Sequence, residues 1–148
     1  MKHFVLSILI AGLIPGLSAL AGFDGWLTDF NQAKKAAVEK KMPILAVFAG
    51  TDWCGWCIKL DEEVFSQAEF TKYAKNNLVM FLADFPQTHE LAPALTKQNQ
   101  ALAGAYGVEG FPTVLLLNAD GKVLAKTGYR PGGPAQYVEH IKSLLKNP

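Results

Sequence analysis

An unbroken run of six apolar residues, Ile44–Ala49, ends five residues before the first of two closely spaced cysteines. A strand that alternates apolar and polar residues can face water on one side, but an unbroken apolar run needs cover on both faces. Layers of helices on the two sides of a sheet provide that cover, and they define the α/β class of folds. The run therefore predicts an α/β architecture with a buried central strand at residues 44–49.

The rest of the chain alternates between helical and extended patterns. Thr28 or Asp29 can cap the first helix, and Ser66 and Glu69 have the spacing of a capping box at the start of the third. A turn at residues 118–121 joins the last two strands into a hairpin. We expect one domain with a mixed central sheet and helices on both faces. Helices are predicted over residues 29–39, 54–65, 66–75, 93–106 and 133–145, and further strands over residues 78–83, 113–117 and 122–126.

The N-terminus has the pattern of a secretory signal peptide. Lys2 and His3 precede an apolar run over residues 4–14, and an Ala-Leu-Ala sequence ends at residue 21. The alternative is a membrane anchor, but the run is shorter than the roughly 20 apolar residues that a spanning helix needs. We therefore predict a signal peptide at residues 1–21 and a mature domain at residues 22–148, located in the periplasm or outside the cell. Contact with a membrane is expected only through an uncleaved signal segment.

Cys54 and Cys57 are the two cysteines of the chain. A bridge between residues three apart closes a loop too small to stabilise the fold much, although disulfides persist after export. Haem attachment requires histidine after the second cysteine, and Ile58 stands there. A structural zinc requires four ligands, and His89 and His140 lack partners at zinc spacing. A redox pair is favoured over an inert bridge or a metal site, and we expect no metal and no organic cofactor.

The predicted strand and helix give the two cysteines different surroundings. Cys54 falls at a helix N-terminus, where backbone N–H groups favour a thiolate and lower a cysteine pKa from about 8.5 to between about 3.5 and 7.5. Cys57 falls one turn inside the helix, where it is more covered. Cys54 is therefore the candidate nucleophile that forms a mixed disulfide, and Cys57 the candidate thiol that resolves it.

Two motifs, together with the order of the strands and helices around them, resemble the thioredoxin superfamily over about residues 26–145. They are Trp53-Cys54-Gly55-Trp56-Cys57 after a buried strand and Gly110-Phe111-Pro112-Thr113 before a later one. The longer sequence of residues 51–65 is similar to that of exported bacterial thioredoxin-like proteins. The resemblance implies a thioredoxin-like fold and the activity of an exported protein thiol–disulfide oxidoreductase. Its partners would be protein thiols and disulfides, with a dithiol protein as redox partner.

The resemblance also implies roles for residues around the cysteines. It identifies Pro112 as the family's cis-proline, which faces the redox pair. The backbone of Phe111 would then pair with an extended stretch of substrate. Trp53 and Trp56 would add to an apolar recognition surface, while Trp53 can instead pack inward. The segment at residues 85–102 is longer than in a minimal thioredoxin and is a candidate for shaping specificity.

The chain departs from the family at its proton relay. Counting back from Cys54 places Phe48 where cytosolic thioredoxins carry a buried aspartate, and the accompanying lysine falls near Met80. We therefore expect the usual relay to be absent. Asp61 lies four residues after Cys57 and is a substitute candidate, with a solvated helix acid as the plainer interpretation.

Composition limits the other classes of function. The chain has 14 Lys and Arg against 13 Asp and Glu, without the basic excess of a nucleic-acid binder. Two alternatives to a general oxidoreductase stay open. One is a thioredoxin-like binding module with an idle disulfide, and the other is a dedicated reductase for metal or haem assembly with a single partner.

Overall fold

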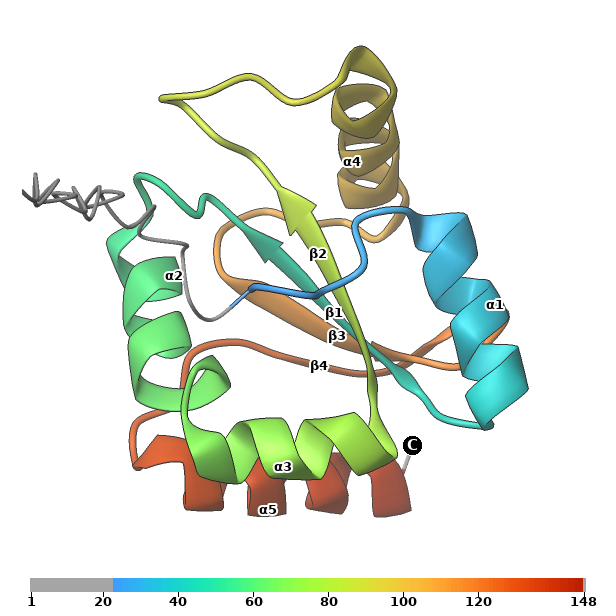
Figure 1. Cartoon of the computed structure of the whole chain (residues 1–148), viewed down its shortest axis with the longest axis vertical. Coiled ribbons are helices and arrows are strands. Elements are labelled where there is room, and N and C mark those ends of the chain that lie inside the picture. Colours follow the sequence, from blue (N-terminus) through green and yellow to red (C-terminus); the bar gives the residue numbers. More distant parts are fainter. Residues whose placement is uncertain (1–22, 148) are drawn as a thin grey trace, which may run out of the picture.

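A four-stranded sheet forms the centre of the computed structural model, which describes residues 23–147 (Figure 1). Its strands stand in the order β2-β1-β3-β4. β1 pairs parallel with β2 and antiparallel with β3, and β3 pairs antiparallel with β4. The sheet is therefore mixed, as predicted. The strands are β1 (Ile44–Ala49), β2 (Val79–Asp84), β3 (Thr113–Leu117) and β4 (Val123–Thr127).

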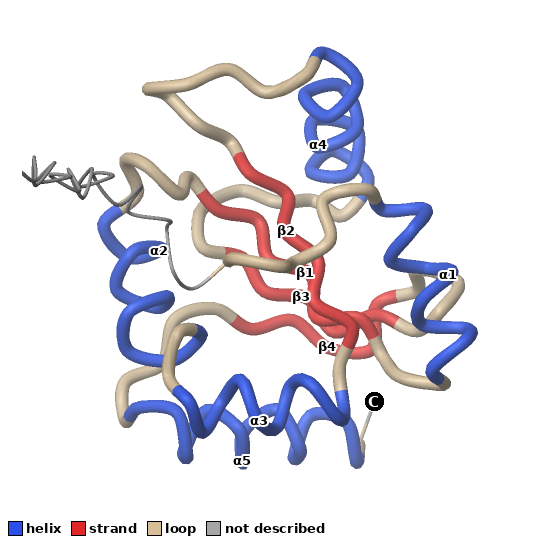
Figure 2. The backbone as a smooth tube through the Cα atoms, in the orientation of Figure 1, coloured by secondary structure: helices blue, strands red, loops and turns tan. Residues whose placement is uncertain are grey.

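Helices cover both faces of this sheet. The side chains of β1 alternate in direction along the strand, so they enter two buried clusters, one on each face of the sheet. Leu45, Val47 and Ala49 face the cluster that contains Cys54 and Cys57. This face is covered by α2 (Gly55–Leu60), η1 (Asp61–Phe65), α3 (Ala68–Asn77) and α5 (Gly133–Lys146). In Figure 2, α3 and α5 run side by side below the sheet.

The opposite face of the sheet buries the other residues of β1. Ile44, Ala46 and Phe48 pack there with the apolar side of α1 (Phe30–Lys40) and with residues from α4 (Pro93–Ala105). The Asp29 carboxylate caps α1 by accepting the N–H of Gln32 at 2.9 Å. Every residue of β1 is buried, as its unbroken apolar run predicts.

Three local predictions need correction. The helix after the cysteines changes at Asp61 into one turn of π-helix, η1. The predicted capping box is absent, because the Ser66 hydroxyl donates instead to the Asp61 carbonyl at 2.7 Å, and α3 begins after Gln67. Closing the π-turn satisfies that carbonyl and shifts the next helix start by one residue. β2 and β4 each begin and end one residue later than predicted.

The predicted signal peptide, residues 1–21, lies outside the described residues. Within residues 23–147, none of the helices combines the length and the apolar character needed to cross a membrane.

Candidate functional site

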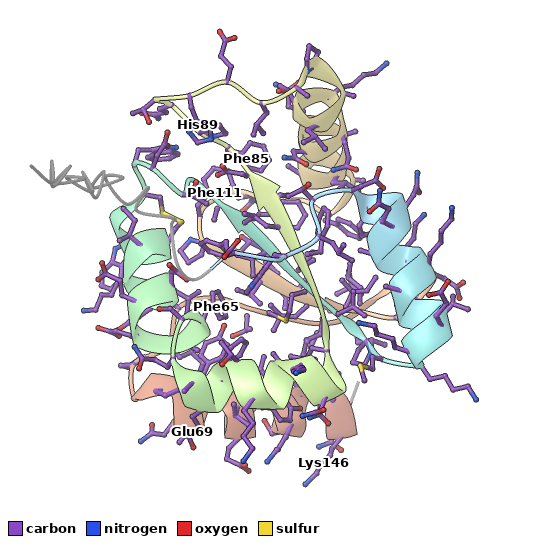
Figure 3. All side chains as sticks on the ribbon, viewed as in Figure 1. Phe65, Glu69, Phe85, His89, Phe111 and Lys146 are labelled. Atoms are coloured by element: carbon purple, nitrogen blue, oxygen red, sulfur yellow. A yellow bond between two sulfur atoms is a disulfide. The ribbon has the colours of Figure 1, made fainter. Side chains whose placement is uncertain are left out.

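Cys54 and Cys57 lie where β1 passes through a short loop into α2. Cys54 is the N-cap residue of α2, and its Sγ accepts the N–H of Cys57 at 3.2 Å. The two residues form a disulfide, with their Cα atoms 5.2 Å apart (Figure 3). Cys54 is 6% exposed and Cys57 is 1% exposed. The first cysteine is therefore at the helix start and the second is the more covered, as predicted.

The segment before β3 brings a second predicted motif to the cysteines. The Phe111–Pro112 peptide bond is cis, which confirms the expectation for Pro112. A pocket of about 470 Å³ lies between Cys54 and the residues that precede Pro112, and we call it the cysteine pocket. Trp53 and Phe111 form two of its walls. It is lined by Trp53, Cys54, Val108, Glu109, Gly110 and Phe111.

Trp53 is both exposed and anchored. The residue is 42% exposed, yet its indole Nε1 donates to the Phe85 carbonyl at 2.7 Å. The Trp53 ring also meets the ring of Phe111 edge-on, with centroids 6.1 Å apart. Phe85 lies against Phe111 at 4.9 Å. These three aromatic residues form one ridge beside the disulfide, and Trp53 is neither purely inward nor purely free.

Trp56 lies between the two cysteines in the sequence and is 57% exposed. Its ring packs on Tyr129 at 5.0 Å, and Lys59 lies over both rings. The Tyr129 hydroxyl donates to Glu63 at 2.7 Å, and this bond to a carboxylate raises the pKa of Tyr129. Trp56 thus packs against Tyr129 and Lys59 while more than half of its surface stays exposed.

A network not anticipated from the sequence joins the cysteine loop to residues 85–91. The Asp52 carboxylate accepts the N–H of Gln87 at 3.0 Å and both the N–H and the hydroxyl of Thr88. These bonds, led by the Thr88 hydroxyl, lower the pKa of Asp52 well below its ordinary value. His89 Nδ1 lies 3.2 Å from the same carboxylate. The partners are 35 to 37 positions apart along the chain, so no local spacing signals them.

Asp84 adds a second tie between the same segments. Its carboxylate accepts the N–H and the hydroxyl of Thr51 at 3.1 and 2.9 Å. The buried side chain of Asn99 donates to the Asp84 carbonyl at 2.9 Å and links this corner to α4. His89 Nε2 lies 3.6 Å from the Asp84 carboxylate, so the ring stands between two acids. Residues 51–53 and 84–89 therefore form one connected unit beside the cysteines.

The structure corrects the position of the missing relay residue. Phe48 is fully buried, but it packs on the face opposite the cysteines, 6.2 Å from Tyr106. The β1 residue on the cysteine face is Val47. The error in counting came from the length of the loop between β1 and Cys54, because a one-residue change reverses the face. Val47 and Phe48 are both apolar, and Met80 of β2 packs on the cysteine face. At these positions β1 and β2 therefore place no ionisable side chain on the cysteine face.

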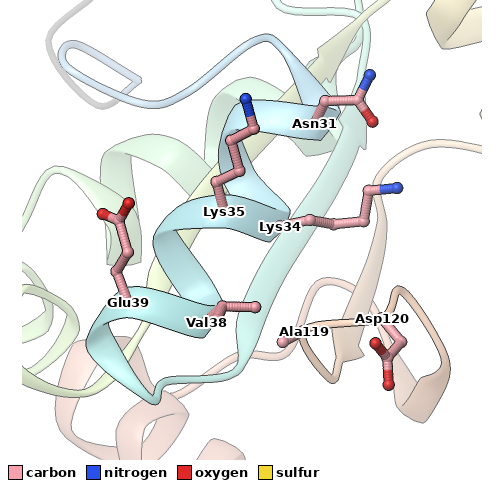
Figure 4. Close-up of a pocket in the computed structure, with 7 residues that line it drawn as sticks. All are labelled: Asn31, Lys34, Lys35, Val38, Glu39, Ala119 and Asp120. Atoms are coloured by element: carbon pink, nitrogen blue, oxygen red, sulfur yellow. The ribbon is translucent and has the colours of Figure 1, made fainter.

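Two other observations bear on the choice of site. In the part of the chain that the structure describes, no three His, Cys, Asp or Glu residues are grouped closely enough to hold a metal. A second hollow of about 610 Å³ lies between α1 and the turn at Ala119 and Asp120 (Figure 4). Its lysine side chains, Lys34 and Lys35, point away from each other rather than converging on a ligand. This hollow therefore carries no functional assignment.

The family model of the thioredoxin-like domain matches residues 30–142. The chain belongs to the thioredoxin-like family. It is 38% identical over 118 residues to the disulfide bond reductase DsbH of Chlamydia pneumoniae, covering 80% of this chain and 71% of that protein. A solved structure of a DsbH oxidoreductase has a TM-score of 0.79 and 34% identity, covering 93% of this chain and 95% of that one.

A second relative is matched over a smaller share of its own length. The thioredoxin-related protein DsbJ of Chlamydia pneumoniae is 27% identical over 154 residues, covering 96% of this chain but 44% of its own length. Together with the disulfide at the helix start, these relationships make this thioredoxin-like protein a thiol–disulfide oxidoreductase with Cys54 and Cys57 as its redox pair.

Proposed function

We propose that this protein is exported and reduces disulfides in other proteins, with Cys54 as the attacking residue and Cys57 as the resolving residue. The observation that carries the proposal is the unequal access of the two sulfurs. Cys54 lines the open cysteine pocket, whereas Cys57 is 1% exposed in the buried cluster. A partner can therefore meet Cys54 first. The relative DsbH is a disulfide bond reductase, which supports this direction of electron flow.

The reaction follows thiol–disulfide exchange. In the reduced protein, the Cys54 thiolate attacks one sulfur of the substrate disulfide. That S–S bond breaks, one substrate thiolate leaves and takes a proton, and a mixed disulfide joins Cys54 to the substrate. The Cys57 thiol then loses its proton and attacks Cys54 Sγ. The second substrate thiolate leaves, and the protein is left with the Cys54–Cys57 disulfide that this structure contains. A dithiol partner protein then returns two electrons and one proton, which restores the Cys54 thiolate and the Cys57 thiol.

The walls of the cysteine pocket would hold the substrate during these steps. Phe111, the residue before Pro112, lines this pocket together with Trp53 and Cys54, so its backbone lies beside them. An extended substrate segment can pair with this backbone by strand addition. Trp53 and Trp56, both exposed, flank the disulfide and would contact apolar groups of the substrate. Four residues, Trp53, Trp56, Phe111 and Pro112, thus form the proposed substrate-binding surface.

Export rests on the signal-peptide pattern of residues 1–21, with residues 22–148 as the mature domain. The final location would be the periplasm or the cell exterior. Expression with a C-terminal tag, followed by fractionation and N-terminal sequencing, tests this assignment. A mature protein that begins at Gly22 supports it, and an intact N-terminus in the cytoplasm contradicts it.

Reduction of insulin with dithiothreitol as electron donor tests the activity. The wild type should precipitate the insulin chains faster than dithiothreitol alone, and Cys54→Ser should abolish the acceleration. Cys57→Ser should accumulate a covalent complex that reducing agent releases, because the mixed disulfide is no longer resolved. A wild type that is inactive with every substrate and at every redox poise would favour the alternatives, a binding module or a dedicated assembly reductase.

The direction of electron flow has its own measurement. Equilibration with a series of glutathione redox buffers gives the reduction potential of the Cys54–Cys57 pair. A reductase should have a potential near or below that of thioredoxin, about −270 mV, whereas a potential near −120 mV is typical of a strong oxidant. The second result would reverse the proposed direction while leaving the redox pair in place.

A further inference from the structure

A second pocket adjoins the cysteine pocket across the aromatic ridge. It has a volume of about 760 Å³ and lies between residues 85–91 and the first turns of α4. We call it the loop pocket. Trp53 lines both pockets, and Phe85 of the loop pocket stacks on Phe111 of the cysteine pocket. Figure 3 shows His89, Phe85 and Phe111 following one another along this side of the molecule. The two pockets are therefore neighbouring parts of one surface.

The hydrogen bonds described above fix the segments that line the loop pocket. Asp52 fastens Gln87 and Thr88, and the Trp53 indole fastens the carbonyl of Phe85. On the other side, Asn99 of α4 bonds to the Asp84 carbonyl. Binding sites for side chains and small molecules are usually formed before the ligand arrives, which lowers the entropy cost of binding. These bonds give the loop pocket that property.

Its lining favours an apolar occupant. Trp53, Phe85, Leu91 and Pro93 supply carbon surface, while Asn99 is already bonded to backbone at the base. His89 also lines the pocket, between the carboxylates of Asp52 and Asp84. Asp84 itself, Glu90 and Lys97 bring two carboxylates and one ammonium group to the lining. The Asp84 carboxylate is already hydrogen-bonded to Thr51, and Glu90 and Lys97 are opposite in sign, so these charges do not single out an ionic ligand. A volume of this size readily holds an aromatic or branched aliphatic side chain.

We propose that the loop pocket receives an aromatic or aliphatic side chain of the substrate polypeptide, a few residues along the chain from the cysteine whose disulfide is attacked. The inference rests on the proposed function, because it assigns a specificity site to the same reaction. Its occupant follows from continuity: a segment that pairs with the backbone of Phe111 beside Cys54 passes the aromatic ridge and reaches the loop pocket. Successive side chains of an extended segment alternate in direction, so one position should dominate.

Peptide disulfides test the proposal. A set of otherwise polar peptides, each with one leucine moved through the positions flanking the disulfide-bonded cysteine, is reduced by the wild type with dithiothreitol as electron donor. One position should raise kcat/KM by about ten-fold or more over the all-polar peptide, as expected when a pocket gains an apolar side chain. Hydroxyethyl disulfide, which is too small to span the two pockets, serves as the reference substrate.

A filled pocket provides the matching variant. Thr96 is exposed on α4 and lines the loop pocket, so Thr96→Trp should occupy it. The control Thr71→Trp makes the same change at an exposed position of α3, at the opposite end of the molecule (Figure 1). Thr96→Trp should cancel the leucine preference while reducing hydroxyethyl disulfide and the all-polar peptide at the wild-type rate. Thr71→Trp should keep the preference. Gln100→Trp, also in the lining, replaces Thr96→Trp if that variant does not fold.

The outcomes separate this proposal from the proposed function. If the wild type reduces the peptides without preference for leucine at any position, or if Thr96→Trp and Gln100→Trp leave the preference intact, the loop pocket is not a substrate site. If the wild type reduces neither the peptides nor hydroxyethyl disulfide, the proposed reductase activity itself fails.

Discussion

Val47 and Cys57 lie in the same buried cluster on one face of the sheet, whereas Phe48 lies in the cluster on the other face. Both Val47 and Cys57 are almost completely shielded from solvent. Side chains of a strand alternate between faces, so an acid placed near the cysteines has to enter at position 47 rather than 48. This relationship determines how the missing proton relay can be probed.

The variant Val47→Asp should introduce a titrating group near the redox pair. Burial favours the neutral acid and raises the pKa of the new carboxyl above its ordinary value. We expect an additional ionisation between about pH 6 and 9 in the rate of hydroxyethyl disulfide reduction. The free energy of unfolding should fall by about 3 kcal/mol, because an apolar group is replaced by a buried polar one.

Val47→Asn is the control for Val47→Asp, since it has a similar shape and does not titrate. Phe48→Asp should destabilise the protein without the additional ionisation. The assignment of faces is contradicted if Phe48→Asp, and not Val47→Asp, changes the pH profile.

Asp52 should make the protein less stable in acid. Its pKa in the folded state is lowered by the hydrogen bonds from Thr88 and Gln87, while an unfolded aspartate titrates near pH 4. The unfolded chain therefore takes up the proton first, and the stabilisation is present above about pH 4 and lost as the pH falls below it. Urea unfolding of wild type and Asp52→Asn between about pH 2.5 and 7 measures this. Asn keeps an oxygen acceptor but not the charge.

The stability of Asp52→Asn should depend less on pH below about pH 4 than that of the wild type. The groups facing this carboxylate, His89 and Asp84, are unchanged in the variant. Parallel stability curves for the two proteins over this range would show that the network around Asp52 does not favour the charged carboxylate.

Trp56 should matter more for protein substrates than for folding. The side chain is 57% exposed and rests on Tyr129, so Trp56→Ala should change the free energy of unfolding by less than about 1 kcal/mol. Loss of an exposed aromatic contact should raise KM for insulin by about five-fold or more. The rate with hydroxyethyl disulfide should stay within about two-fold of wild type, and an equal loss with both substrates would contradict a recognition role.

Tyr137 should limit stability in alkali. The ring is 1% exposed and its hydroxyl donates to the Gly128 carbonyl at 2.9 Å, and burial raises its pKa well above the ordinary value. The folded state therefore holds the proton more tightly than the unfolded chain, and stability is lost as the pH rises above about 10. Tyr137→Phe should lose about 1 kcal/mol at neutral pH and show a weaker alkaline decline. Denaturant unfolding at pH 7 and above pH 10 checks both effects.

Most of the fold could be predicted from the sequence, because apolar runs, helix caps and turns depend on residues that are close together in the chain. The apolar run of β1, the Asp29 cap and the turn before β4 each depend on neighbouring residues, and the structure contains all three. The predicted cis bond at Pro112 came from the family resemblance rather than from any local pattern. The same local reasoning failed at Ser66, where a π-helical turn competes with the capping box for the hydroxyl.

The parts of the site that were missed depend on distant partners. Asp52 and Thr88 are 36 positions apart, and Trp53 and Phe85 are 32 apart, so only the folded chain brings them together. The face of Phe48 was misassigned because the count assumed a loop length that the sequence does not reveal. In each case the deciding quantity is a three-dimensional distance or a register, and neither is encoded in spacing along the chain.

The network that holds residues 85–91 joins side chains of the cysteine loop to backbone groups of the segment and to the side chains of Thr88 and His89. Gln87, Thr88, His89 and Glu90 are all exposed. Residues 87–90 thus contribute little to the buried clusters below them. The network uses Gln87 through its backbone N–H, so exchange of Gln87 and Glu90 is expected to leave the redox pair unaltered while Asp52, Trp53, Asp84 and Thr88 are kept. This region is therefore a natural place to redesign which proteins the molecule reduces, and a place where related proteins can diverge in substrate while the chemistry stays the same.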